Sequence, residues 1–361
     1  MLGLVLAAAA FLRFYRIDAL PLGFHYDEGL DAVSAHEIWS KGVHPIFFPQ
    51  SGSREPLMIY LESFGILALG ATRMGARIAQ AFVGTGTVVA GWFLFRALFD
   101  RRVALLATSF LAVSLWHMFE SRLGLRAISQ PLVEALALLF LWRAVAQRRW
   151  PDALLAGAFV GLAQYTYTAA RALPAFVALL LVCQALFSPG FVRRQWAHMV
   201  GLVGAALAMF APLGWYAINH WQEFFGRSLQ VNLIAPEQFT GAAQAGGVGA
   251  ALLRTLGMFS IHGDPAWKYN VAGLPVFDWP VSALFYGGLV LAVAGVARWL
   301  RVPRNARPPA SPYPFALLAT VVMLTPGFLS AEAPHFLRTI GVLPLLFVFP
   351  ALGLNWLLDL H

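Results

Sequence analysis

Charged residues are scarce in this sequence. Of its 361 residues only 12% are Asp, Glu, Lys or Arg, whereas 59% are hydrophobic. Soluble globular domains carry about 25% charged residues, so this chain has roughly half the charge needed to cover a surface that faces water. Its mean hydropathy is +0.69, and apolar stretches recur from one end to the other. The composition excludes an ordinary soluble enzyme and a disordered chain, and it predicts a polytopic α-helical membrane protein.

Cysteine is almost absent as well. The single cysteine, Cys183, lies inside an apolar run, which excludes a disulfide framework and cysteine-based metal sites. The net charge of +8 comes mostly from arginines that stand singly or in pairs at the ends of apolar segments. Because no block of five like charges occurs, nucleic acid is not an expected partner. The first seven residues contain no basic residue, so we interpret them as part of a first membrane helix rather than a signal peptide.

A helix crosses the roughly 30 Å of bilayer hydrocarbon in about 20 residues. Ten segments are apolar enough to be predicted as spans, some of them slightly short: 1–16, 76–98, 103–119, 129–147, 152–169, 172–187, 197–218, 279–299, 314–330 and 338–357. The apolar stretch 56–71 is either another span or a helix that lies along the membrane surface. With no soluble domain left over, residues 1–361 form one predicted transmembrane domain. Its two long outer loops cover about 17–75 and 219–278, and a Pro/Arg-rich cytoplasmic linker covers about 300–313.

The placement of arginine decides how 56–71 is interpreted, because cytoplasmic loops collect Lys and Arg. If this stretch does not cross and the amino terminus is cytoplasmic, the inner turns hold twelve arginines: Arg96, Arg101, Arg102, Arg143, Arg148, Arg149, Arg193, Arg194, Arg298, Arg301, Arg304 and Arg307. The short outer loops then hold four: Arg122, Arg126, Arg171 and Arg338. If the stretch crossed, this ratio would invert. We therefore predict that 56–71 is a surface helix within the first outer loop.

Acidic residues gather in the predicted outer loops, and seven of them lie in the first loop. The densest point is His25–Asp31 (HYDEGLD), followed by apolar residues at helical spacing over 32–39. This pattern places Asp27 and Glu28 in the first turn of a short helix just after the first span. A helix amino terminus favours the ionised form of a carboxylate, and such a group can act as a general base toward an acceptor hydroxyl. The alternative is that Asp27 only caps the helix.

The order of several short motifs resembles the GT-C glycosyltransferases, in particular the branch of protein O-mannosyltransferases and aminoarabinose transferases. The motifs are the Asp27-Glu28 pair, the small residues Ala32, Ala35 and Gly42, Arg54-Glu55-Pro56-Leu57, Arg77-Ile78, the turn from Arg96 to Val103 and Ser121-Arg122. The resemblance covers about residues 10–220, and the carboxyl-terminal part is similar more loosely. The surface helix of that family agrees with the arginine distribution.

The resemblance implies an inverting transfer of a sugar from a polyprenyl-phosphate carrier to an acceptor on the outer face. Asp27 matches the aspartate of the family and would be the catalytic base, and Glu28 matches its acidic neighbour, which orients rather than reacts. Arg122 matches an arginine of the second outer loop, and the pair His335 and Arg338 resembles one that precedes the last span.

A lipid phosphate that leaves as an anion also needs a cation, and the guanidinium fork binds phosphate bidentately. The residues alone leave six outer-face candidates: Arg54, Arg122, Arg126, Arg171, Lys268 and Arg338. Of these, Arg122, Arg126 and Arg338, with His335, are the predicted phosphate-binding residues.

Metal ligands are not expected. Some relatives have an acidic residue after the Ser-Arg motif, and metal-dependent oligosaccharyltransferases use such carboxylates as ligands. Here the segment 123–130 contains no acid, and Glu120 precedes the arginine instead. Because a divalent cation prefers two or more hard oxygen ligands, the sequence predicts a metal-independent enzyme without a cofactor.

The segment His262–Asn270 is the most polar and aromatic part of the second outer loop. Tyr269 could stack on a sugar ring and Lys268 could approach the sugar phosphate. The alternative is a belt of aromatic side chains at headgroup level. Together with His25, Tyr26 and Arg54, these two residues form the predicted substrate-binding set. Glu134 lies within a span, where a charge is costly, and its role stays open.

A second class of function fits the composition, namely a polytopic transporter or a flippase for lipid-linked sugars. Such proteins place ionisable residues inside their spans and contain inverted repeats, whereas most ionisable residues here are in outer loops. We therefore favour the enzyme. Its expected partners are a polyprenyl-phosphate-linked sugar, a lipid, protein or glycan acceptor and membrane lipids. Its expected place is the inner membrane, with the active site on the extracytoplasmic face. The sequence does not identify the sugar or the acceptor.

Overall fold

The computed structural model describes residues 1–50, 52–230, 246–304, 306–308 and 310–360. Over these residues the chain is helical, and its β pairing is one isolated antiparallel bridge between Phe48 and Arg54. Part of the predicted second outer loop, 231–245, lies outside the described residues. The prediction of an all-α fold is confirmed.

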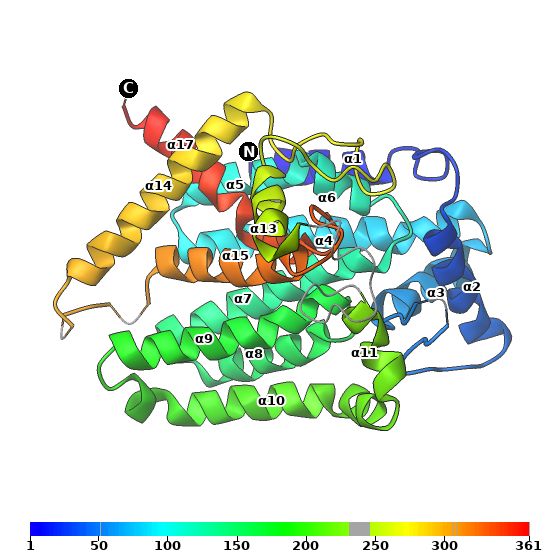
Figure 1. The fold of residues 1–361 in the computed structure, drawn as a ribbon, viewed down its shortest axis with the longest axis horizontal. Helices are drawn as coiled ribbons and strands as arrows, with labels where there is room; N and C mark the ends of the chain where they lie inside the picture. The colour runs from blue at the N-terminus through cyan, green and yellow to red at the C-terminus, as the bar shows by residue number, and fades with distance from the viewer. Residues whose placement is uncertain (51, 231–245, 305, 309, 361) are drawn as a thin grey trace.

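Six helical stretches of the described residues are long and apolar enough to cross a bilayer. They are α4 (Arg73–Leu98), η1 with α7 (Arg126–Ile128, Ser129–Gln147), η2 with α9 (Thr168–Arg171, Ala172–Phe187), α10 (Phe191–Asn219), α14 (Trp279–Arg301) and the broken run η4, α16 and α17 (Ile340–Val342, Leu343–Leu346, Val348–Leu358). Each overlaps a predicted span. In Figure 1 most of them run side by side as one bundle, with α14 leaning across its edge.

Shorter helices occupy the four remaining predicted spans. They are α1 (Leu2–Phe14), α5 with α6 (Arg101–Val113, Leu115–Glu120), α8 (Trp150–Ala163) and α15 (Pro312–Phe328). A helix of 13 to 17 residues is about 20–25 Å long, a little less than the bilayer core. The total of ten spans therefore stays a prediction.

Glycine allows the helices of the bundle to approach closely. A Cβ on Gly157 of α8 would lie 2.0 Å from the carbonyl oxygen of Leu202 on α10, and one on Gly353 of α17 would lie 2.2 Å from that of Leu284 on α14. Within a membrane, helices associate through such close packing because lipid is as apolar as the side chains. These close helix contacts fix the arrangement of the bundle that carries the two long loops.

Among the described residues of the two long loops, four α-helices lie outside the predicted spans: α2 (Tyr26–Ser40), α3 (Leu57–Leu69), α11 (Trp221–Gln230) and α13 (Gly247–Gly257). In Figure 1, α2 and α3 lie together at one end of the bundle. At 13 residues, α3 is about 20 Å long. It packs on α4 where a Cβ on Gly65 would lie 2.4 Å from the carbonyl oxygen of Gly75.

Arginine-bearing turns lie at the opposite end of the bundle. Arg304 donates to the carbonyl of Leu186, Arg307 donates to that of Phe187 at 3.2 Å, and Arg102 forms an ion pair with Asp359 at 2.5 Å. The turns α4–α5, α9–α10 and α14–α15 are thus on the side away from α2 and α3 (Figure 1). The two ends differ in charge as the arginine distribution predicts.

Candidate active site

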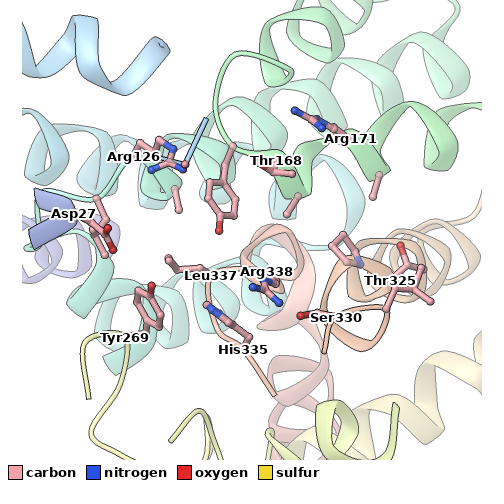
Figure 2. A pocket seen from close by; sticks show the side chains of 18 of the residues that line it. Asp27, Arg126, Thr168, Arg171, Tyr269, Thr325, Ser330, His335, Leu337 and Arg338 are labelled. Atoms are coloured by element: carbon pink, nitrogen blue, oxygen red, sulfur yellow. The ribbon is translucent and has the colours of Figure 1, made fainter. Parts of the chain in front are cut away.

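A cavity of about 610 Å³ lies where the two outer loops meet the bundle. Its polar lining residues are Tyr26, Asp27, Arg126, Tyr167, Thr168, Arg171, Tyr269, Thr325, Ser330, His335 and Arg338. In Figure 2, Arg126, Thr168 and Arg171 lie along one side, with His335, Arg338 and Ser330 along the other. Asp27 and Tyr269 are near one end and Thr325 is near the other. The cavity therefore joins a carboxylate to several cationic side chains.

Asp27 is the second residue of α2, and it does not cap that helix. The cap is His25, whose side chain accepts a hydrogen bond from the backbone N–H of Asp27 at 3.1 Å, while Glu28 completes the capping box by accepting from the His25 N–H. The alternative that Asp27 is the helix cap is therefore wrong. Its side chain is 37% exposed, and Lys268 Nζ lies 3.8 Å from its carboxylate. Asp27 faces the cavity with its carboxylate available to a second group.

Glu28 points the other way. Its side chain is fully buried and forms an ion pair with Arg77, with the Nε–Oε1 distance at 2.5 Å. The same carboxylate accepts the backbone N–H of Gly124 at 3.0 Å. Glu28 therefore ties α2 to α4 and to the loop that follows α6, and it is not a lining residue of the cavity. This buried, paired position of Glu28 fits an orienting role, which the resemblance implies, better than a role as the reacting group.

Three arginines reach the cavity, and each is paired with an acid. Arg126 Nε lies 3.3 Å from Glu55, Arg171 Nη2 lies 3.7 Å from the same carboxylate, and Arg338 Nη2 lies 2.6 Å from Glu332. Arg126 and Arg338 were predicted to bind phosphate, and Arg171 was one of the six outer-face candidates. A guanidinium can share its five donors between a carboxylate and a phosphate. The three arginines can thus hold an anion in this cavity.

Arg122 and Arg54, by contrast, are held elsewhere. Arg122 donates to three backbone carbonyls at the end of α1 and beyond it, those of Leu12, Tyr15 and Leu20. It lines a second, smaller cavity of about 280 Å³ among apolar side chains. Arg54 is buried and forms an ion pair with Asp31 at 2.7 Å. The structure does not bring either arginine to the main cavity, so Arg122 as a phosphate ligand and Arg54 as a substrate ligand find no geometric support.

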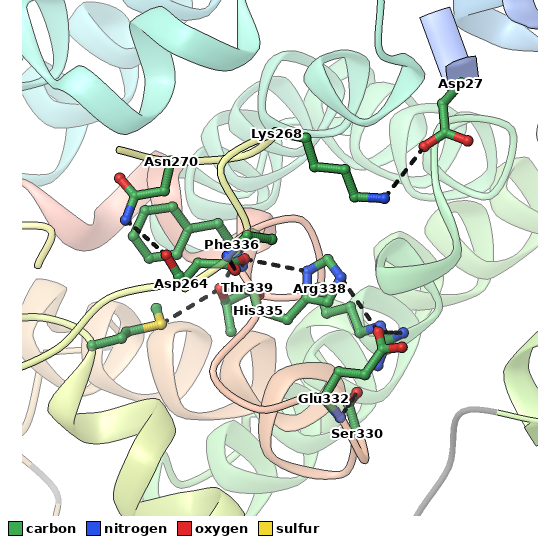
Figure 3. Close-up of polar contacts among 12 residues, drawn as sticks. Asp27, Asp264, Lys268, Asn270, Ser330, Glu332, His335, Phe336, Arg338 and Thr339 are labelled. Carbon is green, nitrogen blue, oxygen red and sulfur yellow. Dashed lines mark hydrogen bonds and ion pairs between the residues drawn. The ribbon is translucent and has the colours of Figure 1, made fainter. Parts of the chain in front are cut away.

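The second outer loop reaches the cavity through a network around Asp264 (Figure 3). This carboxylate accepts the backbone N–H groups of Ala266 and Phe336, both at 2.8 Å, and lies 3.7 Å from His335 Nδ1. Burial raises the pKa of Asp264. The Tyr269 ring packs on His335 with 4.9 Å between the ring centroids. Asp264 thereby holds the backbone next to His335, and the packed rings of His335 and Tyr269 form part of one wall of the cavity.

Tyr269 keeps its phenol proton over a wide range of pH. Burial and the nearby Tyr167 and Asp27 raise its pKa. Lys268 Nζ lies 4.8 Å from the centre of its ring. The phenol can therefore donate a hydrogen bond to a ligand in the cavity. The substrate-binding roles of these two residues, and of His25 and Tyr26, stay predictions.

Several lining residues had no sequence signal. Thr168, Thr325 and Ser330 line the cavity, but single Ser and Thr residues near the ends of apolar segments are too common to stand out. Glu55 belongs to the Arg54-Glu55-Pro56-Leu57 motif and Asp264 to the polar segment His262–Asn270, but neither pattern marks the residue itself as part of a site. Glu134, whose role the sequence left open, accepts a hydrogen bond from Gln130 at 3.1 Å.

No cluster of three or more His, Cys, Asp or Glu side chains suited to a metal ion occurs among the residues that the structure describes. The acids nearest the cavity are each engaged by a basic side chain: Asp27 by Lys268, Glu55 by Arg126 and Glu332 by Arg338. The prediction of a metal-independent enzyme stays a prediction.

Comparisons with known proteins agree with the resemblance. Residues 50–216 match the family model described as dolichyl-phosphate-mannose-protein mannosyltransferase, and no curated protein sequence matches the chain. The crystal structure of ArnT from Cupriavidus metallidurans bound to undecaprenyl phosphate is similar, with a TM-score of 0.66 and 18% identity over 98% of this chain and 60% of ArnT.

More distant structures share the fold as well. The oligosaccharyltransferase of Archaeoglobus fulgidus in complex with Zn and sulfate has a TM-score of 0.56 and 18% identity over 99% of this chain and 49% of that one. The archaeal oligosaccharyltransferase AglB, also from Archaeoglobus fulgidus, was solved in complex with an inhibitory peptide and a dolichol-phosphate. It has a TM-score of 0.52 and 16% identity, over 99% of this chain and 50% of that one. The chain thus spans about half to three-fifths of these proteins. The resemblance to the GT-C superfamily, and the GT-C fold, are confirmed.

Proposed function

We propose that this chain is a membrane glycosyltransferase that moves a sugar from a polyprenyl-phosphate donor to an acceptor on the extracytoplasmic face. The observation that carries the proposal is the cavity in which Asp27 lies with Arg126, Arg171 and Arg338. A carboxylate base and a set of phosphate-binding cations are the two parts that such a transfer requires. ArnT, the neighbour with the TM-score of 0.66, was crystallised with undecaprenyl phosphate.

The proposed chemistry is one in-line displacement. Asp27 takes the proton of the acceptor hydroxyl as the acceptor oxygen forms its bond to the anomeric carbon of the sugar. The bond between that carbon and the phosphate oxygen breaks on the opposite face, so that the configuration inverts. The polyprenyl phosphate leaves with the electron pair and gains negative charge. The cavity arginines stabilise this charge, because preorganised donors act where charge develops.

The charges at the two ends of the bundle support the proposed side of the membrane. The arginine-bearing turns lie at one end (Figure 1), and the cavity lies at the end of the two long loops. Because Lys and Arg are retained on the cytoplasmic side, this arrangement supports a cavity on the extracytoplasmic face. In a bacterial cell the proposed membrane is the inner membrane, where a polyprenyl carrier presents its head group.

The test is transfer by the purified protein in liposomes that contain a sugar linked to undecaprenyl phosphate. We expect Asp27→Asn to lower the rate at least 100-fold, because a general base contributes about 10²- to 10⁴-fold. The matched control is Asp18→Asn, which changes an exposed acid of the same loop and is expected to transfer at the wild-type rate. Full activity of Asp27→Asn would remove Asp27 from the mechanism.

The same liposomes separate the enzyme from a transporter or flippase. A flippase would move the labelled lipid-linked sugar between leaflets without forming a glycosylated acceptor. Movement without product, over a set of lipid, peptide and glycan acceptors, would overturn the proposed activity. The identity of the sugar would follow from mass spectrometry of glycans and lipids in cells with and without the gene.

A further inference from the structure

Glu55 has a position that the proposed chemistry leaves unexplained. It is 1% exposed and stands just before α3. Thr168 donates a hydrogen bond to its Oε1 at 2.7 Å, Arg126 Nε lies 3.3 Å from its Oε2 and Arg171 Nη2 lies 3.7 Å from its Oε1. These three partners line one side of the cavity (Figure 2). Glu55 itself lies behind that wall.

The two arginines are also held on their other sides. The guanidinium of Arg171 lies 4.2 Å from the centre of the Phe224 ring and donates to the Phe224 carbonyl at 3.1 Å. The guanidinium of Arg126 lies 5.5 Å from the centre of the Tyr167 ring. A guanidinium held between a carboxylate and an aromatic face has a fixed orientation. Glu55 is the contact that the two arginines share.

Glu55 also sets the charge of this wall. Two guanidinium groups and one carboxylate leave one net positive charge beside the cavity. The donor in the proposed reaction is a phosphodiester with one negative charge. The released lipid phosphate is a monoester, and such groups carry about −1.5 to −2 charges at pH 7. A wall with two unbalanced arginines would therefore bind the product more strongly than the donor.

We propose that Glu55 is a positioning residue that fixes Arg126 and Arg171 in the cavity wall and halves the charge they present, which allows the lipid phosphate to be released. This inference rests on the proposed function, because it takes a polyprenyl phosphate as the ligand of the wall. It assigns Glu55 no contact with substrate. The effect on the ligand is exerted through the two arginines.

Two substitutions separate charge from geometry. Glu55→Gln keeps the size of the side chain and removes its charge, so we expect undecaprenyl phosphate to bind about three- to tenfold more tightly, with kcat and KM both lowered in sugar transfer. Glu55→Asp keeps the charge but is one methylene shorter and cannot reach all three partners. We expect it to lower transfer without tightening the binding. The matched control is Glu37→Gln, a partly exposed acid of the same loop that pairs with Lys41.

The binding of undecaprenyl phosphate to purified protein is measured first, and transfer is measured on the same preparations. Binding by Glu55→Gln that is unchanged or weaker than wild type overturns the inference. A wild-type protein that binds undecaprenyl phosphate yet transfers no sugar overturns the proposed function, and the binding comparison still decides the role of Glu55. A wild-type protein that does not bind this lipid overturns both.

A second pair of variants applies if Glu55→Gln does not fold. Thr168→Val removes the hydroxyl that holds Glu55 Oε1, whereas Thr168→Ser retains it. We expect the valine variant to lose several-fold in transfer with unchanged thermal stability and the serine variant to lose less. Equal losses in both variants would contradict a role for the hydrogen bond to Glu55.

Discussion

Asp27 and Glu28 are adjacent in the sequence but lie in different environments. Successive residues of a helix point about 100° apart, so the first turn of α2 directs Asp27 toward the cavity and Glu28 into the protein. The buried carboxylate of Glu28 is satisfied by Arg77 and by the N–H groups of Gly124 and His25. One acid is thus available for chemistry while its neighbour holds the helix in place.

Glu28→Gln is expected to destabilise the protein strongly. The substitution leaves the guanidinium of Arg77, which is 1% exposed, without its counter-charge, and breaking a buried ion pair in this way costs about 3–5 kcal/mol of unfolding free energy. The midpoint of thermal unfolding in detergent should fall by several degrees. Asp27→Asn serves as the control, because its partly exposed side chain should leave the midpoint nearly unchanged. Equal midpoints for the two variants would contradict the division of roles.

Chelation is expected to leave turnover undiminished. The arginines of the cavity can take the charge of the leaving phosphate, and segment 123–130 lacks the acids that serve as ligands in metal-dependent relatives. Sugar transfer should therefore proceed equally with and without an excess of EDTA, and added Mg²⁺ or Mn²⁺ should not accelerate it. Strong inhibition that is reversed by adding either ion would show that a metal takes part.

At the scale of elements, α3 explains how the first outer loop carries the site. The buried face of this helix includes Glu62, which accepts a hydrogen bond from Gln80 of α4 at 3.1 Å. On the other face Leu61, Phe64 and Leu67 are exposed, as expected for a helix at a membrane surface. The loop that precedes α3 contains Glu55, so the packing of α3 on α4 also places that residue beside the arginines.

Glu62 should make stability depend on pH. Burial, and then the nearby Asp31, raise its pKa well above the usual value. Because the folded state holds this proton more tightly than the unfolded state, the stabilisation is complete below the unfolded pKa of about 4.3. It is lost as the pH rises through the raised folded pKa. We expect the thermal midpoint of the wild type to fall with rising pH over this window, and that of Glu62→Gln to fall less.

The measurement is thermal unfolding from pH 4 to pH 8 for the wild type, for Glu62→Gln and for the control Glu37→Gln. The control changes a partly exposed side chain and should retain the wild-type profile. At pH 8 the Glu62→Gln variant should be the most stable of the three proteins. A wild-type profile that runs parallel to that of Glu62→Gln would show that Glu62 does not titrate in this range.

Much of the helical framework could be predicted from the sequence, because apolar length and arginine placement are local signals. Breaks within a span were not predicted. Segment 103–119 is divided at Ser114 into α5 and α6, and segment 338–357 is divided into η4, α16 and α17. These breaks depend on capping and on packing against neighbours. A proline such as Pro344 can lie in a first helical turn without revealing where the preceding turn ends.

The site could be predicted only in part. The acid-rich motif at the start of α2 was sufficient to single out Asp27, which lines the cavity. Its role as a base stays a prediction. Local sequence could not show which of the six candidate cations reach the cavity, because the direction of each long side chain depends on tertiary contacts. Arg122 is drawn to the carbonyls at the end of α1, whereas Arg126, four residues later, reaches the cavity. The contact between Glu55 and Thr168 joins residues 113 positions apart, and no local pattern marks it.

At the scale of the whole molecule, the fold separates two kinds of charge. Arg102 and Arg304 lie in turns at one end, and the cavity with its paired acids lies at the other. The long loops bring segments from the first half and the last third of the chain to that cavity. The proposed mechanism requires this end to face the side of the membrane where the donor presents its phosphate, so membrane orientation is the property on which the mechanism depends.

Cysteine labelling tests that orientation. The one native cysteine, Cys183, is first replaced by alanine. A new cysteine is then placed at Leu22, which is 86% exposed in the loop before α2, or at Pro189, which is exposed in the turn between α9 and α10. On intact cells or spheroplasts, a membrane-impermeant maleimide should label Leu22→Cys at once and Pro189→Cys only after the membrane is permeabilised. The reverse pattern would place Asp27 on the cytosolic side, where the proposed acceptor is not presented, and would overturn the mechanism whatever the effect of Asp27→Asn.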